Sequence, residues 1–537
     1  METVELGLAL FLAVAAMGAL ARWTPLPLPM LLVIGGAALS FVPGLSGVRL
    51  DPDVFFLLFV PLLLFGDGWQ FPKREFVNYL RPILLLALGL VAMTVVVVGY
   101  LMHWLIPSLP LAAAFTLGAI VSPTDAVATA AVTARLPLPS RAAHILNGES
   151  LINDASGLVA FKFAVAAVAT GAFSWIGAGE ALVLLAGGGA LVGLAVAAVI
   201  GELRVRLVRF CVDDPTIQTM VSLLTPYAAY LAAEHLHVSG ILAVVAAGLY
   251  AGVHDTRHLS VATRRHAWEV WAMLLYVFNG LAFLLLGLQL KSVLEGMRGE
   301  SWTGLVVYAL ALFAAITLVR VIWVYPSTYL PLLLSRRIRE REGWRDPRAV
   351  FLVGWAGIRG SVTLAAALSI PFATATGTAF PDRDLILFLA GTTIVLTLAI
   401  NGLTLPALIR VLDVRGDRTA EREERAARLA VSQAAANAVR IEIARLKRPE
   451  EIAFAERLIA DYDAKLHRHS ANGPRRQDLD NVAAAERRLK LTALAAERAE
   501  LHSLRDTLVI NEQTLRAIEA EIDHAETLVV GVPRAGH

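Results

Sequence analysis

The stretch Asn147–Phe163, NGESLINDASGLVAFKF, lies inside a long apolar run and carries polar groups that such a run does not normally hold. These groups are Glu149, Asn153, Asp154 and Lys162. An ionisable side chain at membrane depth costs at least ~2.5–3.5 kcal/mol, so each one needs a partner, a water-filled cavity or a function. The stretch therefore predicts a membrane helix that carries a polar site.

The composition supports a membrane protein. Of the 537 residues, 57% are hydrophobic and 17% are charged, whereas soluble chains average roughly 25% charged residues. Apolar runs of about 20 residues, the length that spans a bilayer as a helix, recur along the first 415 residues. The single cysteine, Cys211, excludes an internal disulfide and a cysteine-based metal site. We expect an all-α polytopic membrane protein with no cofactor and no nucleic-acid partner.

Thirteen apolar segments predict about 13 transmembrane helices. The boundary between the eighth and the ninth is weak, which leaves 12 as the alternative count. The predicted spans are 3–21, 27–43, 53–66, 82–105, 109–134, 143–170, 179–203, 216–233, 237–253, 268–290, 303–334, 348–371 and 384–412.

The basic residues of the connections predict the orientation in the membrane. One alternating set of connections holds eighteen Lys and Arg residues, and the opposite set holds only Arg49, Lys291, Arg298 and Arg383. Because Lys and Arg concentrate in cytoplasmic loops, the N-terminus is predicted outside and the C-terminus in the cytoplasm. The plasma membrane is the expected location.

The composition changes after about Gly416. Residues 416–537 are rich in Ala, Glu, Arg and Leu, with opposite charges three or four positions apart, which is typical of solvated helices. This part is predicted to be a cytosolic helical tail. We expect a helical hairpin that turns at Ala471–Arg476 and packs on itself or on a second subunit; a regulatory sensor is the alternative.

Two predicted helices are interrupted. Segment five contains VSPTDAV, with Pro123 and Asp125, and segment twelve contains GWAGIRGSVT around Arg359. Proline removes a backbone donor inside a helix, and unwound backbone is tolerated at membrane depth only where it is buried or lines a cavity. Paired interrupted helices in comparable places of two halves indicate an inverted repeat and a transporter's binding site. Simple kinks are the alternative.

The sixth segment offers two functional faces. Ser150 and Asp154 are four residues apart and share one face, and Glu149 and Asn153 share the neighbouring one. Asp154 lies about 13 residues beyond Arg141, near ~20 Å along the helix and close to mid-membrane. Desolvation disfavours the charged form of a carboxylate there, so Asp154 is expected to hold a proton or a cation, but not both. A structural carboxylate is the alternative.

Other charged residues at membrane depth also need a partner or a function, because burying a charge is costly. Arg320 in the eleventh segment is expected to pair with Glu149, because an unpaired buried charge is costly. Arg359 is expected to neutralise the carbonyl ends of the interrupted helices. Asp67 ends the third segment, either as the guard of an ion entrance or as an ordinary helix-end carboxylate. Lys162 is expected to reach the outer interface.

The motifs GESLIND, SPTDAV before it and GIRGSV after it resemble the sodium/proton exchanger branch of the monovalent cation:proton antiporter-1 family. The resemblance covers residues 1–415 in order and spacing. It implies a homodimer of 13-helix subunits, each with a dimerisation domain and a moving core domain. It also implies that two broken helices cross near the midplane.

The resemblance also assigns residues. It implies that Asp154 binds the exchanged ion or proton, together with Asn153, Ser150, Thr124 and Asp125. Of these, Asp154, Ser150 and Thr124 are the expected Na⁺ ligands. It further implies a structural pair formed by Glu149 and Arg320, a core charge at Arg359 and, on a looser alignment, an acidic position at Asp67. An Asn-Asp pair in place of two aspartates resembles the electroneutral members.

These observations predict a secondary antiporter that exchanges a monovalent cation, Na⁺ foremost, for H⁺ by alternating access at Asp154. One carboxylate that carries either one proton or one monovalent cation makes the exchange electroneutral. A K⁺/H⁺ antiporter of the same fold, or one that also takes Li⁺, is the alternative, followed by an ion channel. An enzyme is not expected, because the chain contains neither HExxH nor GxSxG.

Overall fold

A computed structural model describes most of the chain: residues 2–24, 26–42, 52–133, 138–170, 175–210, 214–297, 301–374, 378–414, 419–470, 474–507, 509 and 511–530. The chain divides into two compact units, Met1–Gly416 and Asp417–His537. The tail boundary predicted near Gly416 and the first half of the predicted turn at Ala471–Arg476 lie outside the described residues.

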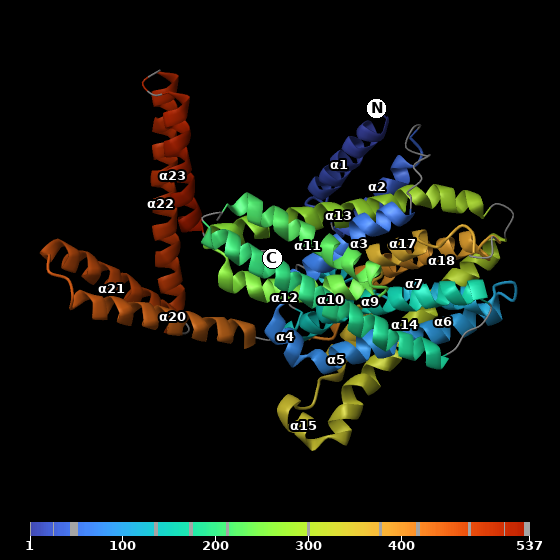
Figure 1. The fold of residues 1–537 in the computed structure, drawn as a ribbon. Coiled ribbons are helices and arrows are strands. Elements are labelled where there is room, and N and C mark those ends of the chain that lie inside the picture. The colour runs from blue at the N-terminus through green and yellow to red at the C-terminus, as the bar shows by residue number, and fades with distance from the viewer. Residues whose placement is uncertain are drawn as a thin grey trace. The chain divides into compact units, whose positions relative to one another are not determined.

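The first unit is built of helices (Figure 1), and the strand-like pairing among its described residues is one isolated bridge between Ala373 and Ala379. The helices before the first break are α1 Glu2–Leu20, α2 Leu28–Leu39, α3 Pro52–Gln70, α4 Lys73–Asn78, α5 Leu80–Leu84, the π-helix η1 Leu85–Leu90, α6 Val91–Leu105 and α7 Leu111–Val121. Those up to the second break are α8 Ala126–Thr133, α9 Ser140–Thr170, α10 Trp175–Arg209, α11 Pro215–His235, α12 Gly240–His258, α13 Val261–Gly296, α14 Trp302–Leu334, α15 Arg336–Glu342 and α16 Pro347–Trp355. The last are α17 Ser361–Leu368, α18 Arg383–Leu396, the π-helix η2 Thr397–Gly402 and α19 Leu403–Val411.

Each of the thirteen predicted segments coincides with one of these helices or with a consecutive group of them. Among the described residues, six spans are long and apolar enough to cross a membrane, and the bent pair α7–α8 is a seventh. Shorter apolar helices occupy 7–20, 28–39 and 57–70. The all-helical polytopic architecture is thus confirmed, while the number of crossings stays a prediction.

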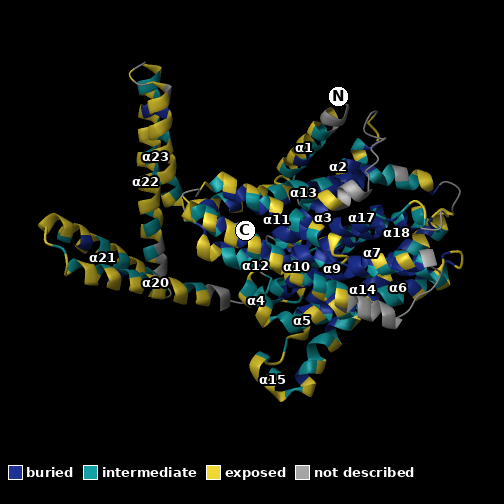
Figure 2. Cartoon of the chain, in the orientation of Figure 1, coloured by how far each residue is buried: buried dark blue, intermediate teal, exposed yellow. Residues whose placement is uncertain are grey.

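The interior of the first unit is densely buried (Figure 2). It contains a second buried ion pair that the sequence analysis did not single out. The Arg204 guanidinium on α10 donates to Asp255 on α12 at 2.8 Å, and the Trp69 indole on α3 donates to the other oxygen of the same carboxylate at 3.1 Å. The Asp255 carboxylate therefore joins α3, α10 and α12. Separating these helices would be costly, because breaking a buried pair leaves an uncompensated charge.

The two π-helical segments were not predicted. Such segments often occur near functional sites. Here, two backbone carbonyls of η1 accept hydrogen bonds from side chains of other helices. In η1, the Ala87 carbonyl accepts from the Ser156 hydroxyl at 2.6 Å, and the Leu85 carbonyl accepts from the Trp323 indole at 3.0 Å. The η1 segment thereby holds α9 two residues beyond Asp154.

The second unit consists of α20 Thr419–Ile443, α21 Pro449–Ser470, α22 Pro474–Asp506 and α23 Glu512–Val530. These form two antiparallel hairpins where we expected one (Figure 1), because the chain also turns between α20 and α21 and between α22 and α23. Arg440 pairs with Asp463 in the first hairpin, and Arg498 pairs with Asp523 and Glu526 in the second. The helical nature of this unit follows the prediction, and its role stays untested.

Candidate functional site

The two interrupted helices meet at their breaks. The first break separates α7 from α8, and the second separates α16 from α17. The backbone N–H of Asp125 donates to the Ile358 carbonyl at 2.7 Å. The Asp125 carboxylate accepts in turn from the backbone N–H of Ser361 at 3.3 Å. Unwound backbone in one helix therefore satisfies unwound backbone in the other, which explains how both are tolerated inside an apolar unit.

Local sequence explains why both helices stop here. Pro123 cannot donate a backbone hydrogen bond, and Asp125 restarts the helix by accepting from the Ala128 N–H at 2.9 Å, as a capping residue does. In the second break, a Cβ on Gly360 would lie 1.6 Å from a carboxylate oxygen of Asp125. A glycine is therefore required for the two breaks to approach this closely.

Arg359 is buried between the half-helices. Its Nε donates to the Val121 carbonyl at the end of α7, at 2.9 Å, and one terminal nitrogen donates to the Gly357 carbonyl at 2.6 Å. Its own N–H donates to the Thr397 hydroxyl at 3.1 Å. A cation at these helix C-termini balances their negative ends.

Glu149 and Arg320 form a fully buried, two-pronged ion pair. One guanidinium nitrogen contacts Oε1, and the other donates to Oε2 at 2.8 Å. The Arg320 Nε also donates to the Val353 carbonyl at 3.3 Å. The pair joins α9, α14 and α16, and its bidentate geometry fixes their relative positions.

Asn153 and Thr124 extend this network. The Asn153 amide donates to the Thr124 hydroxyl at 2.8 Å, and that hydroxyl donates to Glu149 at 3.3 Å. The Thr124 hydroxyl hydrogen therefore points toward Glu149. These contacts connect the first break to the polar face of α9 that lies next to Asp154.

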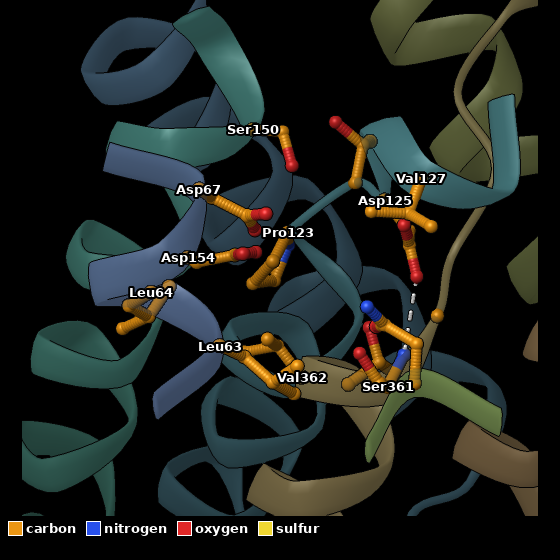
Figure 3. A pocket seen from close by; sticks show the side chains of 14 residues that line it. Leu63, Leu64, Asp67, Pro123, Asp125, Val127, Ser150, Asp154, Ser361 and Val362 are labelled. Carbon is orange, nitrogen blue, oxygen red and sulfur yellow. Dashed lines mark hydrogen bonds between the residues drawn. The ribbon is translucent and has the colours of Figure 1, made fainter. Parts of the chain in front are cut away.

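A small cavity lies beside this network (Figure 3). Its volume of about 20 Å³ is enough for one water molecule, because ~10–15 Å³ suffices for one. Asp67, Asp154 and Ser150 lie along one side, and Ser361 lies across from them. The Ser150 hydroxyl also accepts from the Ala126 N–H at 3.2 Å. A single desolvated monovalent ion suits these dimensions.

The cavity is lined by three acidic side chains, Asp67, Asp125 and Asp154, and by no basic one among the described residues. Carboxylate and hydroxyl oxygens are ligands for hard cations. Within the described part of the chain, no three His, Cys, Asp or Glu side chains gather as a site for a bound metal ion. The carboxylate and hydroxyl oxygens of the cavity therefore suit a cation or a proton.

The predicted site residues separate into two groups. Asp67, Thr124, Asp125, Ser150 and Asp154 line the cavity, and Glu149, Asn153, Arg320 and Arg359 surround it without lining it. Lys162 belongs to neither group, because it pairs with Glu234 at 2.9 Å where both side chains are partly exposed.

Sequence reasoning missed several contributors. Asn279 and Thr363 also line the cavity, and Asn401 in η2 donates to the Trp355 carbonyl at the end of α16 at 3.1 Å. Thr397 and Asn401 are polar, four residues apart and inside an apolar segment. That spacing is the same signal that singled out Ser150 and Asp154.

Comparisons with known proteins identify the family of the chain. Residues 8–411 match the family described as sodium/hydrogen exchanger, transmembrane. The chain is 38% identical to a protein of Escherichia coli K12 named as the uncharacterized Na⁺/H⁺ exchanger YjcE, over 97% of each chain. It is 37% identical to a sodium, potassium, lithium and rubidium/H⁺ antiporter of Bacillus pumilus, over 98% of this chain and 78% of that protein.

Among solved structures, the fold is similar to that of the sodium proton antiporter MjNhaP1 of Methanocaldococcus jannaschii. The TM-score is 0.58 at 20% sequence identity, over 77% of this chain and 99% of the other. This likeness supports the fold alone, and the family follows from the sequence matches. The chain, a multi-pass membrane protein, belongs to the sodium/hydrogen exchanger family.

Proposed function

We propose that the chain is a secondary antiporter that exchanges a monovalent cation, Na⁺ foremost, for a proton, and that Asp154 holds one or the other. The observation that carries the proposal is the cavity for a single ion, lined by Asp154, Asp67 and Ser150 beside two broken helices. The printed name of the Bacillus pumilus relative includes potassium, lithium and rubidium. Those cations are the alternative substrates for the same site.

The exchange follows from exclusive occupancy of one carboxylate. In one stroke, a cation binds the ionised Asp154 carboxylate and the oxygens of Ser150 and Thr124. In the other, the cation leaves and a proton binds an oxygen of Asp154. The loaded site has the same net charge in both strokes, so one cation exchanges for one proton without moving net charge across the membrane. Transport requires the cavity to open to one side at a time, and no bond of a substrate is made or broken.

The surrounding residues act by holding the cavity in place. Glu149 and Arg320 act as a rigid pair. Asn153 holds the first break next to this pair by donating to the Thr124 hydroxyl. The Asp125 carboxylate accepts hydrogen bonds from backbone N–H groups in the first turns of α8 and α17. Asp67 adds a further negative charge to the cavity wall, where it attracts the cation from the entrance.

We infer a plasma-membrane location with the N-terminus outside, the C-terminal unit in the cytoplasm and two copies per assembly. Support comes from the uneven distribution of basic connections and from the family resemblance of residues 1–415. Reactivity toward an impermeant reagent of single cysteines placed at Glu5 or at Glu450, in a protein with Cys211→Ser, tests the orientation. Mass measurement in nanodiscs tests the copy number.

The direct test is transport by purified protein in liposomes that contain a pH-sensitive dye. A Na⁺ gradient should drive a pH change with the wild type and none with Asp154→Asn. Asp384→Asn is the matched control, because this aspartate is exposed in α18 and does not line the cavity. Exchange at the wild-type rate by Asp154→Asn would overturn the proposal.

A second measurement separates electroneutral exchange from its alternatives. The initial rate should stay the same when a membrane potential of either sign is imposed. A rate that follows the voltage would mean unequal charge movement, which two titrating carboxylates at Asp67 and Asp154 would produce. Macroscopic current in planar bilayers, without coupled proton movement, would instead identify a channel.

A further inference from the structure

Thr363 has a hydroxyl that the fold leaves without a hydrogen-bond partner. It is the third residue of α17, its side chain is 1% exposed, and its Oγ1 contacts no donor or acceptor among the described residues. A buried hydroxyl without a partner is unfavourable and calls for an explanation. Thr363 also lines the cavity that contains Asp154.

Several other buried threonines in this unit satisfy their hydroxyls within their own helices. Thr116, Thr225 and Thr393 each donate to the carbonyl four residues earlier, at 2.7–3.0 Å. Thr363 lies in the first turn of α17, where the residue four positions earlier is Arg359, before the helix begins. Its hydroxyl is therefore available to an occupant of the cavity.

The position of Thr363 gives this hydroxyl a distinct role. Asp67 belongs to α3 and Asp154 to α9, whereas Thr363 belongs to α17, which follows the second break. The carboxylates supply charge to any monovalent cation. The neutral hydroxyl oxygen of Thr363 on α17 supplies a further ligand. How closely this oxygen approaches the cation depends on the radius of the cation.

We propose that Thr363 is a cation ligand contributed by the second broken helix and that it determines which monovalent cation the cavity favours. The proposal rests on the proposed function of Asp154. Small cations such as Li⁺ and Na⁺ are strongly hydrated and need several close oxygen ligands in exchange for their water. Larger cations such as K⁺ and Rb⁺ are less strongly hydrated, so the removal of one oxygen ligand weakens their binding less. When Asp154 is protonated, the same hydroxyl donates its hydrogen to the carbonyl oxygen of the Asp154 carboxylic acid or to water, so it has a partner in both strokes.

The test compares four variants of the full chain in liposomes, with KM and maximal rate measured for Li⁺, Na⁺, K⁺ and Rb⁺ at one pH. Thr363→Val keeps the shape and removes the hydroxyl, and Thr363→Ala removes it without adding volume. Thr363→Ser retains the hydroxyl. Thr317→Val is the matched control, because Thr317 is also buried without a hydroxyl partner among the described residues but does not line the cavity.

We expect Thr363→Val and Thr363→Ala to raise the KM for Li⁺ and Na⁺ by about five- to tenfold, and the KM for K⁺ and Rb⁺ by less than half of that factor. Thr363→Ser and Thr317→Val should stay within about twofold of the wild type. If the valine protein does not fold, the alanine protein carries the test.

Unchanged ratios of KM among the four cations in Thr363→Ala would overturn the inference, as would an equal change in Thr317→Val. The result is separable from the proposed function. Loss of exchange in Asp154→Asn together with wild-type selectivity in Thr363→Ala would contradict only the role of Thr363. Retained exchange in Asp154→Asn would contradict the proposed function itself.

Discussion

The Asp125 carboxylate accepts a hydrogen bond from the backbone N–H of Ser361, 236 residues later in the chain. Its other oxygen accepts from the Ala128 N–H. One carboxylate thus caps the first turns of both α8 and α17, whose positive ends it balances. Because this contact joins the two broken helices, a shift of either helix must move or break it.

Gly360→Ala should abolish most exchange. The added Cβ would lie 1.6 Å from an oxygen of Asp125, so the contact between the breaks must open, at a cost of ~1–3 kcal/mol or more. We expect at least about a tenfold loss of rate in liposomes. Gly391→Ala in α18 is the control, because its Cβ would meet only Leu286 at 3.9 Å. Equal rates in the two variants would contradict the close approach.

Glu149→Gln should lower the stability of the protein by ~3–5 kcal/mol, because it leaves the Arg320 charge buried and unpaired. The measurements are expression yield and thermal unfolding in detergent. Lys162→Gln removes the partner of Glu234 in a partly exposed pair of similar length, 2.9 Å, and should cost at most ~1 kcal/mol. If both substitutions had the same small effect, Glu149 and Arg320 would not be the structural pair of the core.

Asp67→Asn should weaken cation binding but preserve coupling to protons. Removing one negative charge from the cavity wall lowers the attraction for the cation, and we expect the KM for Na⁺ to rise about tenfold, equivalent to ~1.4 kcal/mol. The one-for-one exchange should remain insensitive to voltage. A variant that changed its response to voltage would indicate that Asp67 titrates together with Asp154.

Glu342 should make stability depend on pH. Burial raises the pKa of Glu342, but the hydrogen bond and charge of Arg141, with the charges of Arg81 and Arg345, outweigh burial and hold the pKa below the ordinary value of 4.5. A lowered pKa in the folded state stabilises the protein above the ordinary value, and this contribution is lost as the pH falls through the folded value.

Glu342→Gln should therefore destabilise the protein by on the order of 1 kcal/mol at about pH 7, and the difference from the wild type should shrink as the pH falls below the ordinary value of 4.5. Thermal unfolding at several pH values measures this difference. Glu340→Gln, in an exposed pair with Arg336, should show little effect at any pH. A pH-independent difference for Glu342→Gln would count against the cluster of Arg81, Arg141 and Glu342.

Most of the architecture was predictable, because membrane helices are recognisable in a sequence by their length and apolarity. The breaks were visible as Pro123 and as the glycines around Arg359. Pairing of Glu149 with Arg320 followed from the cost of an unpaired charge, although 171 residues separate them. The π-helical segments and the second tail hairpin were missed, because neither changes the apolar or charge pattern of the sequence.

The sequence by itself determined which helices exist, where two of them stop and which charges must find partners. These are properties of single segments, governed by hydropathy, backbone donors and desolvation. Only the tertiary structure decided that Asp67 and Thr363 face the same cavity as Asp154, while Thr124 turns its hydroxyl hydrogen toward Glu149. The rotation and depth of one helix against another depend on packing across the whole unit, and no local pattern encodes them.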